Sequence, residues 1–368
     1  MQQVDFTALA SPGVRELVPY QPGKPIAELK RELGVDEVIK LASNENALGP
    51  SPHALSAAQQ ALCESHYYPD GSGYILKQAL ADHLKIPTDR ITLGCGSDNI
   101  ISLLAQIFAG PGDETVIAQY AWGVYEIVTH ASGADPVFIG AHNWAHDLSA
   151  MAAAVNPKTK IIFLANPNNP TGTQFGHDEF TAFMQQIPSH VVVVLDEAYY
   201  EFAAPETLPH SLALQQQYRN LVVTRTFSKA YGLAGLRVGY SLSDPQIADL
   251  LNRVRLPFNV NTPALAAATA ALKDKTHLER ALQMIANGRQ QLLKGFIELN
   301  LNAITSTTNF FCVDFNRPAL PIYEALLREG LIVRPLLPYQ LPNHLRITVG
   351  LPEQNTALVN ALTKILKK

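Results

Sequence analysis

A lysine follows an apolar, strand-like run by only a few residues in the stretch RTFSKAYGLAGLRVGY, residues 225–240, and an arginine comes eight residues later. The lysine is Lys229 and the arginine is Arg237. A lysine amine forms imines with carbonyl compounds when burial or nearby cations lower its pKa. A guanidinium presents a rigid fork of donors that suits phosphate oxygens. Most lysines after strands are simply solvated, so other groups must converge on Lys229 before it becomes a candidate nucleophile.

The neighbours of the lysine add hydroxyl groups and flexible turns. Thr226 and Ser228 lie beside it in the sequence and carry hydroxyl groups. Gly232 and Gly235 follow, and we expect both to let the backbone turn so that Arg237 points back toward the lysine.

Three further apolar runs also end in polar, turn-forming residues. Residues 91–93 are followed by GCGSDN, residues 160–165 by NPNNPTG, and residues 191–195 by DEAYYEF. Ligands of open α/β sheets bind beyond the carboxyl ends of the strands. We therefore expect these three segments and the lysine segment after residues 221–224 to line one edge of a sheet.

The GCGSDN segment leads into an expected helix near Asn99. Free backbone N–H groups at a helix N-terminus, approached through glycines, bind phosphate well. The alternative is a tight turn in which Ser97 or Asp98 caps the helix. A dinucleotide fingerprint is disfavoured, because asparagine stands where the third glycine is needed and no Walker lysine follows.

Two other segments supply an amide, a carboxylate and a phenol. Asn169 lies in a loop held by Pro170, and its amide can donate to a ligand oxygen, although an Asx-type turn is the alternative. Asp196 follows the apolar run VVVVL, where a carboxylate is costly unless it has a partner. It suits the counter-ion of a protonated heterocycle, with Tyr199 as a phenol donor. A helix N-cap is the alternative.

The elements that position these groups alternate along the first two thirds of the chain. Strands are expected at 91–93, 115–118, 136–139, 160–165, 191–195 and 221–224, and helices at 99–109, 148–155 and 178–187. Strands that are apolar throughout and alternate with helices indicate an α/β fold, with a mainly parallel sheet flanked by helices on both faces.

From about residue 244 the pattern changes to a smaller α+β arrangement. Helices are expected at 247–254, 263–272 and 278–299, and strands at 303–314 and 346–349. The first 45 residues are rich in proline, with one short helix at 26–33. We predict three parts: residues 1–45 as an N-terminal arm and part of the small domain, 46–258 as the large domain that carries the site, and 259–368 as the small C-terminal domain.

Composition excludes several classes of protein. The 368 residues are 47% hydrophobic and 16% charged, with a net charge of −4 and no cluster of lysine and arginine among aromatic residues. Nucleic acid and membranes are therefore not expected as partners. No signal peptide or bilayer-spanning stretch is predicted. Three cysteines without C-x-x-C spacing argue against disulfides and structural zinc and favour a reducing cytoplasm.

Taken together, the motifs resemble the pyridoxal-phosphate aminotransferases of the aspartate aminotransferase superfamily over essentially the whole chain. NPNNPTG, DEAY, SKAYGLAGLR and LRITVG occur in the order typical of that family. The segments VPYQPGKP, LASNENALGPSP, YYPDG and AQYAWGVY are similar to its histidinol-phosphate aminotransferase branch. Asn99, where the branch often has glutamate, and Tyr120, where it often has proline, depart from the pattern.

The resemblance implies pyridoxal 5'-phosphate as cofactor and assigns a role to each residue. Lys229 would form the internal aldimine and then serve as general acid and base. Asp196 would pair with the pyridine N–H, and Tyr199 and Asn169 would hold the 3-oxygen of the ring. Trp122 would stack on the ring face. The phosphate would be bound by Ser97, Asp98, Thr226, Ser228, Arg237 and, from the neighbouring subunit of a homodimer, Tyr68.

The resemblance also implies a substrate site. Arg346, in LRITVG, would clamp the carboxylate of glutamate or the phosphate of histidinol phosphate, Tyr20 would cover the substrate, and Arg334 is a further candidate. For both arginines an ion pair at the surface or between the domains is the alternative.

The implied reaction is ping-pong transfer from histidinol phosphate to 2-oxoglutarate, giving imidazole acetol phosphate and glutamate in histidine biosynthesis. An aminotransferase for aromatic amino acids, or a decarboxylase similar to threonine-phosphate decarboxylase, remains an alternative. A non-catalytic regulator is disfavoured, because the residues before GCGSDN show no basic helices and no linker.

Overall fold

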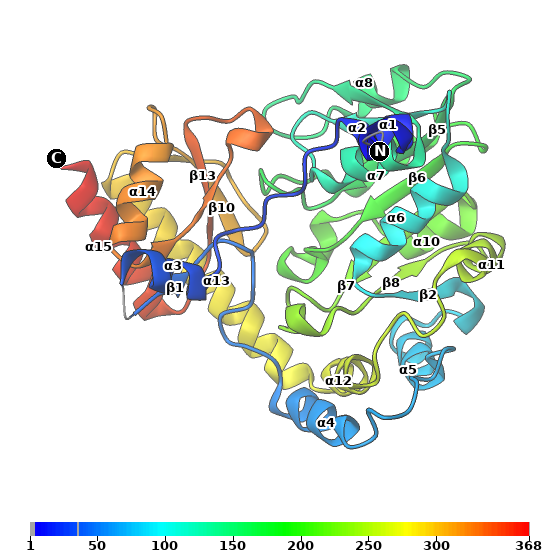
Figure 1. Cartoon of the computed structure of the whole chain (residues 1–368), viewed down its shortest axis with the longest axis horizontal. Coiled ribbons are helices and arrows are strands. Elements are labelled where there is room, and N and C mark those ends of the chain that lie inside the picture. The colour runs from blue at the N-terminus through cyan, green and yellow to red at the C-terminus, as the bar shows by residue number, and fades with distance from the viewer. Residues whose placement is uncertain (1–3, 35–36, 368) are drawn as a thin grey trace.

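The computed structural model describes residues 4–34 and 37–367 of the chain. Two units lie side by side (Figure 1): a large one built on a seven-stranded sheet, and a smaller one built on a four-stranded sheet. Among the described residues, no helix is both long enough and apolar enough to span a membrane.

The central sheet confirms all six predicted strands and adds one. Its order is β2-β8-β7-β6-β5-β3-β4, and neighbouring strands from β7 to β4 pair in parallel. The bounds are β2 Ile91–Gly94, β3 Glu114–Ala118, β4 Asp135–Ile139, β5 Thr159–Ala165, β6 Val192–Asp196, β7 Leu221–Thr226 and β8 Gly239–Leu242. The unpredicted β8 is only four residues long, GYSL, and runs antiparallel between β2 and β7. This segment is a strand because it forms hydrogen bonds with β2 and β7, and not because its four residues have a high intrinsic β-propensity.

Helices cover the faces of this sheet, as its buried strands require. Every residue of β6 is buried, so both faces need covering by other elements. The covering helices are α6 Ser97–Phe108, α7 Val124–Ser132, α8 Leu148–Ala153, α9 His177–Met184, α10 Ser211–Gln217 and α11 Pro245–Val254. The helices predicted at 99–109, 148–155, 178–187 and 247–254 are confirmed with ends shifted by up to three residues, whereas α7 and α10 were not predicted.

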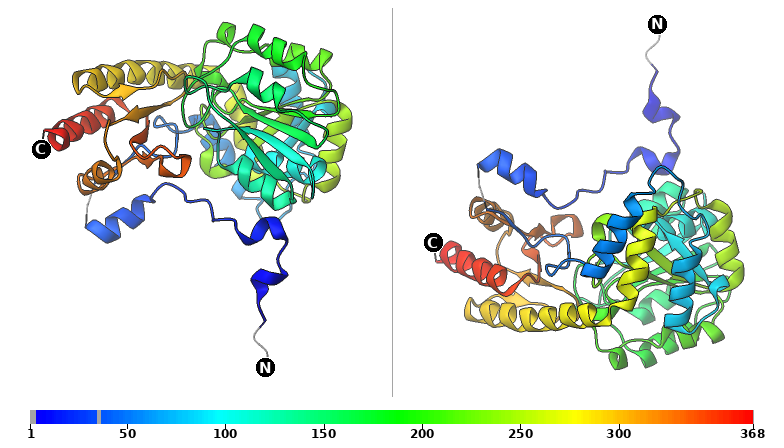
Figure 2. Two further views of the ribbon diagram at one scale, coloured as in Figure 1. Left: turned by 90° about the horizontal axis from the view of Figure 1, so that it is seen from above. Right: turned by 90° about the horizontal axis from the view of Figure 1, so that it is seen from below.

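A layer of helices at one end of the sheet includes an element predicted for the small domain. Helix α12, Thr262–Lys273, packs against α4, Pro52–Leu62, and α5, Tyr74–Leu84, as Figure 2 shows from below. Alanines on its buried face belong to the same core as the central sheet. This packing favours a domain boundary after α12, and we propose that the large domain extends to the start of α13, Lys275–Glu298.

The smaller unit combines distant parts of the chain. Its sheet has the order β12-β13-β10-β9, antiparallel throughout, and helices α13, α14 and α15 pack on it. The bounds are β9 Asn302–Ala303, β10 Phe310–Asp314, β12 Arg334–Pro335, β13 His344–Thr348, α14 Leu320–Arg328 and α15 Pro352–Leu366. The strand structure predicted at 303–314 is present at both ends of that range and interrupted between them, where the Ser306 hydroxyl donates to the carbonyl oxygen of Phe310.

Part of the N-terminal segment pairs with this unit. Strand β1, Ile39–Lys40, pairs in parallel with β11, Leu331–Ile332, and α3, Ile26–Leu33, forms at the predicted positions. Helix α2, Pro12–Arg15, lies against α7, and α1, Phe6–Leu9, extends away from both units (Figure 2).

The two glycines that follow the lysine segment differ in what they allow. Gly232 has φ of +70°, and a Cβ there would lie 2.6 Å from the carbonyl oxygen of Gly49. Gly235 lacks a positive φ, and a Cβ there would meet no atom of the described residues within 4 Å. The expectation that both glycines are needed for the turn is therefore supported for Gly232 and not for Gly235.

We predict that Gly232→Ala destabilises the protein by roughly 2–4 kcal/mol, since it adds a left-handed backbone penalty to a collision with rigid backbone. Gly235→Ala, three residues on, is the matched control and should change stability by less than about 0.5 kcal/mol. Urea unfolding measures both. Equal losses in the two variants would contradict the distinction.

Candidate active site

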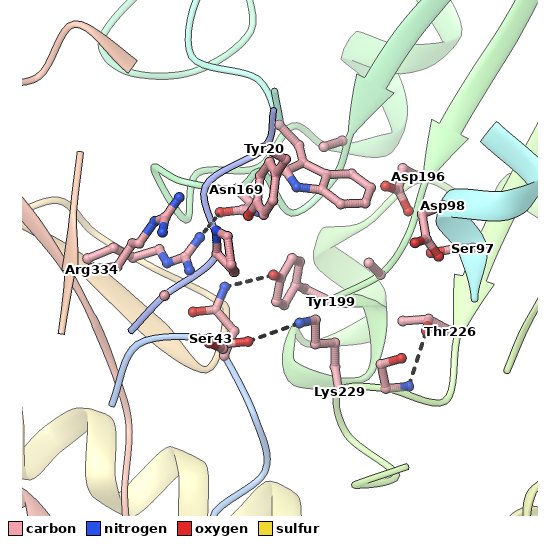
Figure 3. Close-up of a pocket in the computed structure, with 18 of the residues that line it drawn as sticks. Tyr20, Ser43, Ser97, Asp98, Asn169, Asp196, Tyr199, Thr226, Lys229 and Arg334 are labelled. Atoms are coloured by element: carbon pink, nitrogen blue, oxygen red, sulfur yellow. Dashed lines mark hydrogen bonds between the residues drawn. The ribbon is translucent and has the colours of Figure 1, made fainter. Parts of the chain in front are cut away.

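A cavity lies where the carboxyl ends of β5, β6 and β7 face the smaller unit (Figure 3). All the predicted site residues except Tyr68 line it. They are Tyr20, Ser97, Asp98, Trp122, Asn169, Asp196, Tyr199, Thr226, Ser228, Lys229, Arg237, Arg334 and Arg346. The chain brings these side chains together from the N-terminal segment, four strand ends of the large unit and the sheet of the smaller unit.

Lys229 stands three residues beyond the end of β7 with its amine in the cavity. Its Nζ donates to the backbone oxygen of Ser43 at 3.2 Å. Burial lowers the pKa of Lys229 to about 8, and the positive charge of Arg346 acts in the same direction. About one amine in ten is then neutral at pH 7, against a few in ten thousand at the ordinary lysine pKa. A neutral amine is the form that attacks a carbonyl group, so this shift would suit such a reaction.

Asp196, the last residue of β6, is held by two hydroxyl groups that were not predicted. The Tyr125 hydroxyl donates to Oδ2 at 2.8 Å, and the Thr224 hydroxyl donates to Oδ1 at 3.0 Å. Burial raises the pKa of Asp196 to about 6, although these two hydrogen bonds act against the rise. Above that pH the site contains a fixed, buried carboxylate.

The two supporting residues reach Asp196 through tertiary structure. Thr224 is the cross-strand partner of Asp196 in the β6–β7 pair. Tyr125 lies on α7 and stacks on Phe163 of β5 with ring centroids 5.0 Å apart. The motif AQYAWGVY contains this tyrosine, but only the docking of α7 on the sheet gives it a role.

Two arginines of the smaller unit enter the cavity, and no carboxylate of residues 4–34 or 37–367 forms a salt bridge with either. Arg334 and Arg346 are 8% and 6% exposed. Arg346 donates to the side-chain oxygen of Asn169 and to the backbone oxygen of Ala42, and Arg334 donates to the backbone oxygen of Gln21. Neither guanidinium forms a salt bridge with a carboxylate in the described part of the chain, so the ion-pair alternative does not apply. Buried cations of this kind favour an anionic ligand.

A second group of side chains and backbone N–H groups suited to an anion lies at the other end of the cavity, around the first turn of α6. The helix begins at Ser97, so its free N–H groups are available there. Arg237, at φ of +57°, directs its guanidinium to Ser228 Oγ at 3.3 Å and to Asp98 Oδ1 at 2.7 Å. The carboxylate of Asp98 thus orients Arg237, and an anion here would meet the backbone of Asp98 rather than its side chain.

Gly96 gives this region its shape. It has φ of +84°, and a Cβ there would lie 2.3 Å from Nη2 of Arg237. Only a glycine leaves room for the arginine beside the start of α6.

The remaining wall is aromatic. Trp122 contacts Tyr125 edge to face at 5.8 Å between centroids, and the Tyr20 ring lies 5.7 Å from the Arg334 guanidinium. Tyr199 is 4% exposed, and burial raises its pKa well above the ordinary value. Its phenol therefore stays protonated and can donate a hydrogen bond.

Tyr68 lies outside the cavity. It is 81% exposed and stacks on Phe258 with centroids 4.7 Å apart. It is not among the described residues that line the cavity.

The amino-acid sequence is similar to a known protein family and to several of its members. The model of "Aminotransferase class I and II" matches residues 36–362. "Histidinol-phosphate aminotransferase 2" of Pseudomonas fluorescens (strain Pf0-1) is 52% identical over 366 residues, which cover 99% of each chain. "Histidinol-phosphate aminotransferase 1" of Mannheimia succiniciproducens is 52% identical and covers 98% of this chain and 99% of its own.

Solved structures agree in fold. The crystal structure of histidinol-phosphate aminotransferase from Sinorhizobium meliloti in complex with pyridoxal-5'-phosphate superposes with a TM-score of 0.90, at 31% identity over 97% of both chains. A double mutant of Thermus thermophilus aspartate aminotransferase, 22% identical over 97% of this chain and 99% of its own, shares the fold with a TM-score of 0.84.

The raised pKa of Asp196 makes a prediction about stability. The folded protein holds the carboxyl proton more tightly than an unfolded chain, in which the pKa is about 4. Stability from this group is therefore lost as pH rises from about 4 to about 6, and the loss is complete at pH 7. Asp196→Asn, which cannot ionise, should stabilise the ligand-free protein by about 1–3 kcal/mol at pH 7 and much less at pH 4.5.

Urea unfolding at the two pH values measures the effect. Asp244→Asn is the control of opposite sign, because hydrogen bonding from Arg219 lowers the pKa of Asp244 and this variant should lose stability at pH 7. An Asp196→Asn protein that is less stable than the parent by the same amount at both pH values would contradict the raised pKa.

Proposed function

The chain belongs to the class I and II aminotransferase family, and we propose that it is a pyridoxal-phosphate-dependent aminotransferase that transfers the amino group of histidinol phosphate to 2-oxoglutarate. The products would be imidazole acetol phosphate and glutamate. The observation that carries the proposal is the combination, in one cavity, of a half-buried lysine with a lowered pKa and two buried arginines that have no carboxylate partner among the described residues. Identity of about half over the full length with relatives named for this reaction supports the choice of substrate.

The residues present fit pyridoxal phosphate at each of its functional groups. The amine of Lys229 suits the aldehyde, and the carboxylate of Asp196 suits a protonated ring nitrogen. At the other end, the space that Gly96 leaves beside Arg237 suits the phosphate. The further phosphate ligands that we propose are Ser97, Asp98, Thr226 and Ser228. When bound, the cofactor supplies an aldehyde that bonds to amines and a ring that accepts the electron pair left on the substrate carbon.

Lys229 and Asp196 then perform distinct tasks. Lys229 would hold the cofactor covalently through Nζ until the amine of the substrate takes its place. The freed Nζ would take the proton that leaves the amine-bearing carbon of the substrate. Asp196, ionised above pH about 6, would keep the ring nitrogen protonated. The hydroxyls of Tyr125 and Thr224 orient this carboxylate toward the cavity.

Three other side chains fix the orientation of the ring. Tyr199, protonated because it is buried, and the amide of Asn169 would donate to the 3-oxygen. Trp122 would lie against the ring face, where its indole offers a large apolar surface. The side-chain oxygen of Asn169 is already occupied by Arg346, which leaves its N–H₂ group as the donor.

Both substrates carry an anion for the arginines of the smaller unit. Arg346 and Arg334 would bind a carboxylate of glutamate or 2-oxoglutarate in one half-reaction and the phosphate of histidinol phosphate in the other, since a guanidinium fork matches both anions. Tyr20, beside Arg334, would cover the bound substrate. A single site that serves both partners in turn requires ping-pong kinetics.

We propose a homodimer in which Tyr68 reaches the cofactor phosphate of the partner. Tyr68 is highly exposed, and other exposed apolar side chains occur near it or near its stacking partner Phe258 in the sequence: Tyr67, Tyr74, Ile75 and Leu256. The stack of Tyr68 on Phe258 and the bond from Arg255 to the backbone oxygen of Gly71 hold this surface together. Exposed apolar surfaces of this kind typically mark protein interfaces. A cytoplasmic location, proposed on the three free thiols, suits such an enzyme.

Sedimentation equilibrium should give twice the 40.1 kDa mass of the chain. Tyr68→Phe should keep the dimer but raise the Kd for pyridoxal phosphate about tenfold, because one hydrogen bond to a charged group is lost. Tyr67→Phe, which changes the adjacent tyrosine in the same way, is the control. A monomeric parent protein, or a Kd unchanged in Tyr68→Phe, would contradict the shared site.

The substrate assignment is tested by kcat/KM for histidinol phosphate, phenylalanine and tyrosine, each with 2-oxoglutarate as acceptor. We expect a preference of about a hundredfold or more for histidinol phosphate, because its phosphate and imidazole suit the arginines and the polar cavity. Lys229→Ala should lose at least about a thousandfold in kcat with every substrate. Lys294→Ala, at an exposed lysine of α13, should retain normal activity.

Two outcomes would overturn this assignment. Higher kcat/KM for phenylalanine or tyrosine would make the protein an aromatic amino acid aminotransferase. Release of CO₂ from an amino acid phosphate would instead identify a decarboxylase.

A further inference from the structure

A buried asparagine outside the proposed catalytic set contacts the phenol of Tyr199. Asn44 is 1% exposed, and its Nδ2 donates to the Tyr199 hydroxyl oxygen at 2.8 Å. This residue belongs to the segment LASNENALGPSP, which passes between the two units. It lines the cavity, yet no step described above uses it.

Asn44 is itself held rigidly by the smaller unit. The hydroxyl of Thr348, on β13, accepts a hydrogen bond from the Asn44 backbone N–H at 3.0 Å and donates to Oδ1 at 3.2 Å. The Asn309 side chain donates to the Asn44 backbone oxygen at 3.0 Å. Every polar group of Asn44 is thus engaged, and its amide is left with one orientation, in which Nδ2 faces the phenol.

The backbone of Asn44 explains why an asparagine stands there. Its φ is +55°, a left-handed conformation that glycine and asparagine adopt most readily. Glycine would permit the conformation but supply no donor. Asparagine satisfies both the backbone and the hydrogen bond to the phenol.

The contact determines which way the phenol proton points. A phenol oxygen accepts and donates. Because Asn44 occupies the acceptor side of Tyr199, the Tyr199 proton turns away from Asn44 and into the cavity. The pKa of Tyr199 is raised by burial, so that proton is retained.

The backbone on either side of Asn44 contacts two more groups of the site. Ser43, the preceding residue, accepts from Nζ of Lys229, as Figure 3 shows. One residue earlier, the backbone oxygen of Ala42 accepts from Arg346 at 2.8 Å. A shift of this segment would therefore move the partners of the amine, the phenol and the anion-binding arginine together.

We propose that Asn44 is a positioning residue that aims the Tyr199 hydroxyl at the 3-oxygen of the bound cofactor. The inference rests on the proposed function. A donor at that oxygen favours the form of the cofactor that carries negative charge there. Asn44 thereby lowers the pH at which the bound cofactor changes its visible absorbance, and it does so only through Tyr199.

The experiment is an absorbance titration of the cofactor-loaded enzyme between pH 5 and 10. Asn44→Gly keeps the left-handed backbone and removes the amide, and it should raise the titration midpoint by about half a pH unit or more. Tyr199→Phe should raise it further. The double variant should have the midpoint of Tyr199→Phe alone, because the proposed effect of the Asn44 amide on the chromophore passes through the Tyr199 hydroxyl.

Two further variants separate positioning from general destabilisation. Asn355→Ala removes an equally buried asparagine that bonds to the Gly350 backbone within the smaller unit, and it should lower thermal stability without moving the midpoint. Thr348→Val frees the Asn44 side chain and should shift the midpoint in the same direction as Asn44→Gly but less. This variant also carries the test if Asn44→Gly does not fold.

The possible results are distinct. A non-additive shift of the kind described supports the proposal. Additive shifts, or Asn44→Gly and Thr348→Val proteins with the parental midpoint, overturn it while leaving the proposed function intact. A parent protein that binds no pyridoxal phosphate and shows no visible absorbance overturns the proposed function and this inference with it.

Discussion

Burying an ionised group without a partner of opposite charge costs free energy, and the cavity between the two units contains several such groups. Asp196 is 4% exposed and is held by two hydroxyls and a backbone N–H, all neutral. Among the described residues, Arg334 and Arg346 bond to neutral oxygens. Burial and the charge of Arg346 lower the pKa of Lys229. These groups lie in positions that a zwitterionic, multiply anionic ligand would complement. These charges therefore lower the free energy of unfolding of the ligand-free chain, and they leave a site whose charged groups are already placed to bind a ligand.

The fold meets this constraint by supporting each charged group from a different element. β7 and α7 supply the hydroxyls for Asp196, and Asp98 on α6 orients Arg237. The backbone of residues 42–44 supports Arg346 and Lys229 and places Asn44 on Tyr199. Because most of these supports are neutral, they fix geometry without neutralising charge, and the charges remain available to a ligand.

The position of the site between the two units has a consequence for its chemistry. The groups proposed for the cofactor come mainly from the large unit, whereas the arginines proposed for the substrate anion come from the smaller one. The segment at 42–44 is one of the places where the chain passes between them, and its backbone also bonds to both. An anion held by Arg346 therefore acts on the same short segment that supports the amine and the phenol.

The sequence by itself determined the features that depend on residues close together in the chain. The buried runs and intervening helical patterns specified the six predicted strands of the sheet, and the turn residues after them located the groups that line the cavity. The features that it missed depend on distant pairs. Strand β8 exists through pairing with β2 and β7, and α12 joins the large core by packing on α4 and α5. Tyr125 lies 71 residues from Asp196, and Asn44 lies 155 residues from Tyr199. Local propensity and periodicity carry no information about such contacts, because they arise only when helices and strands dock. The sequence therefore predicted which side chains line the cavity. The tertiary structure decided which residues bond to those side chains, and so fix their orientation and shift their pKa values.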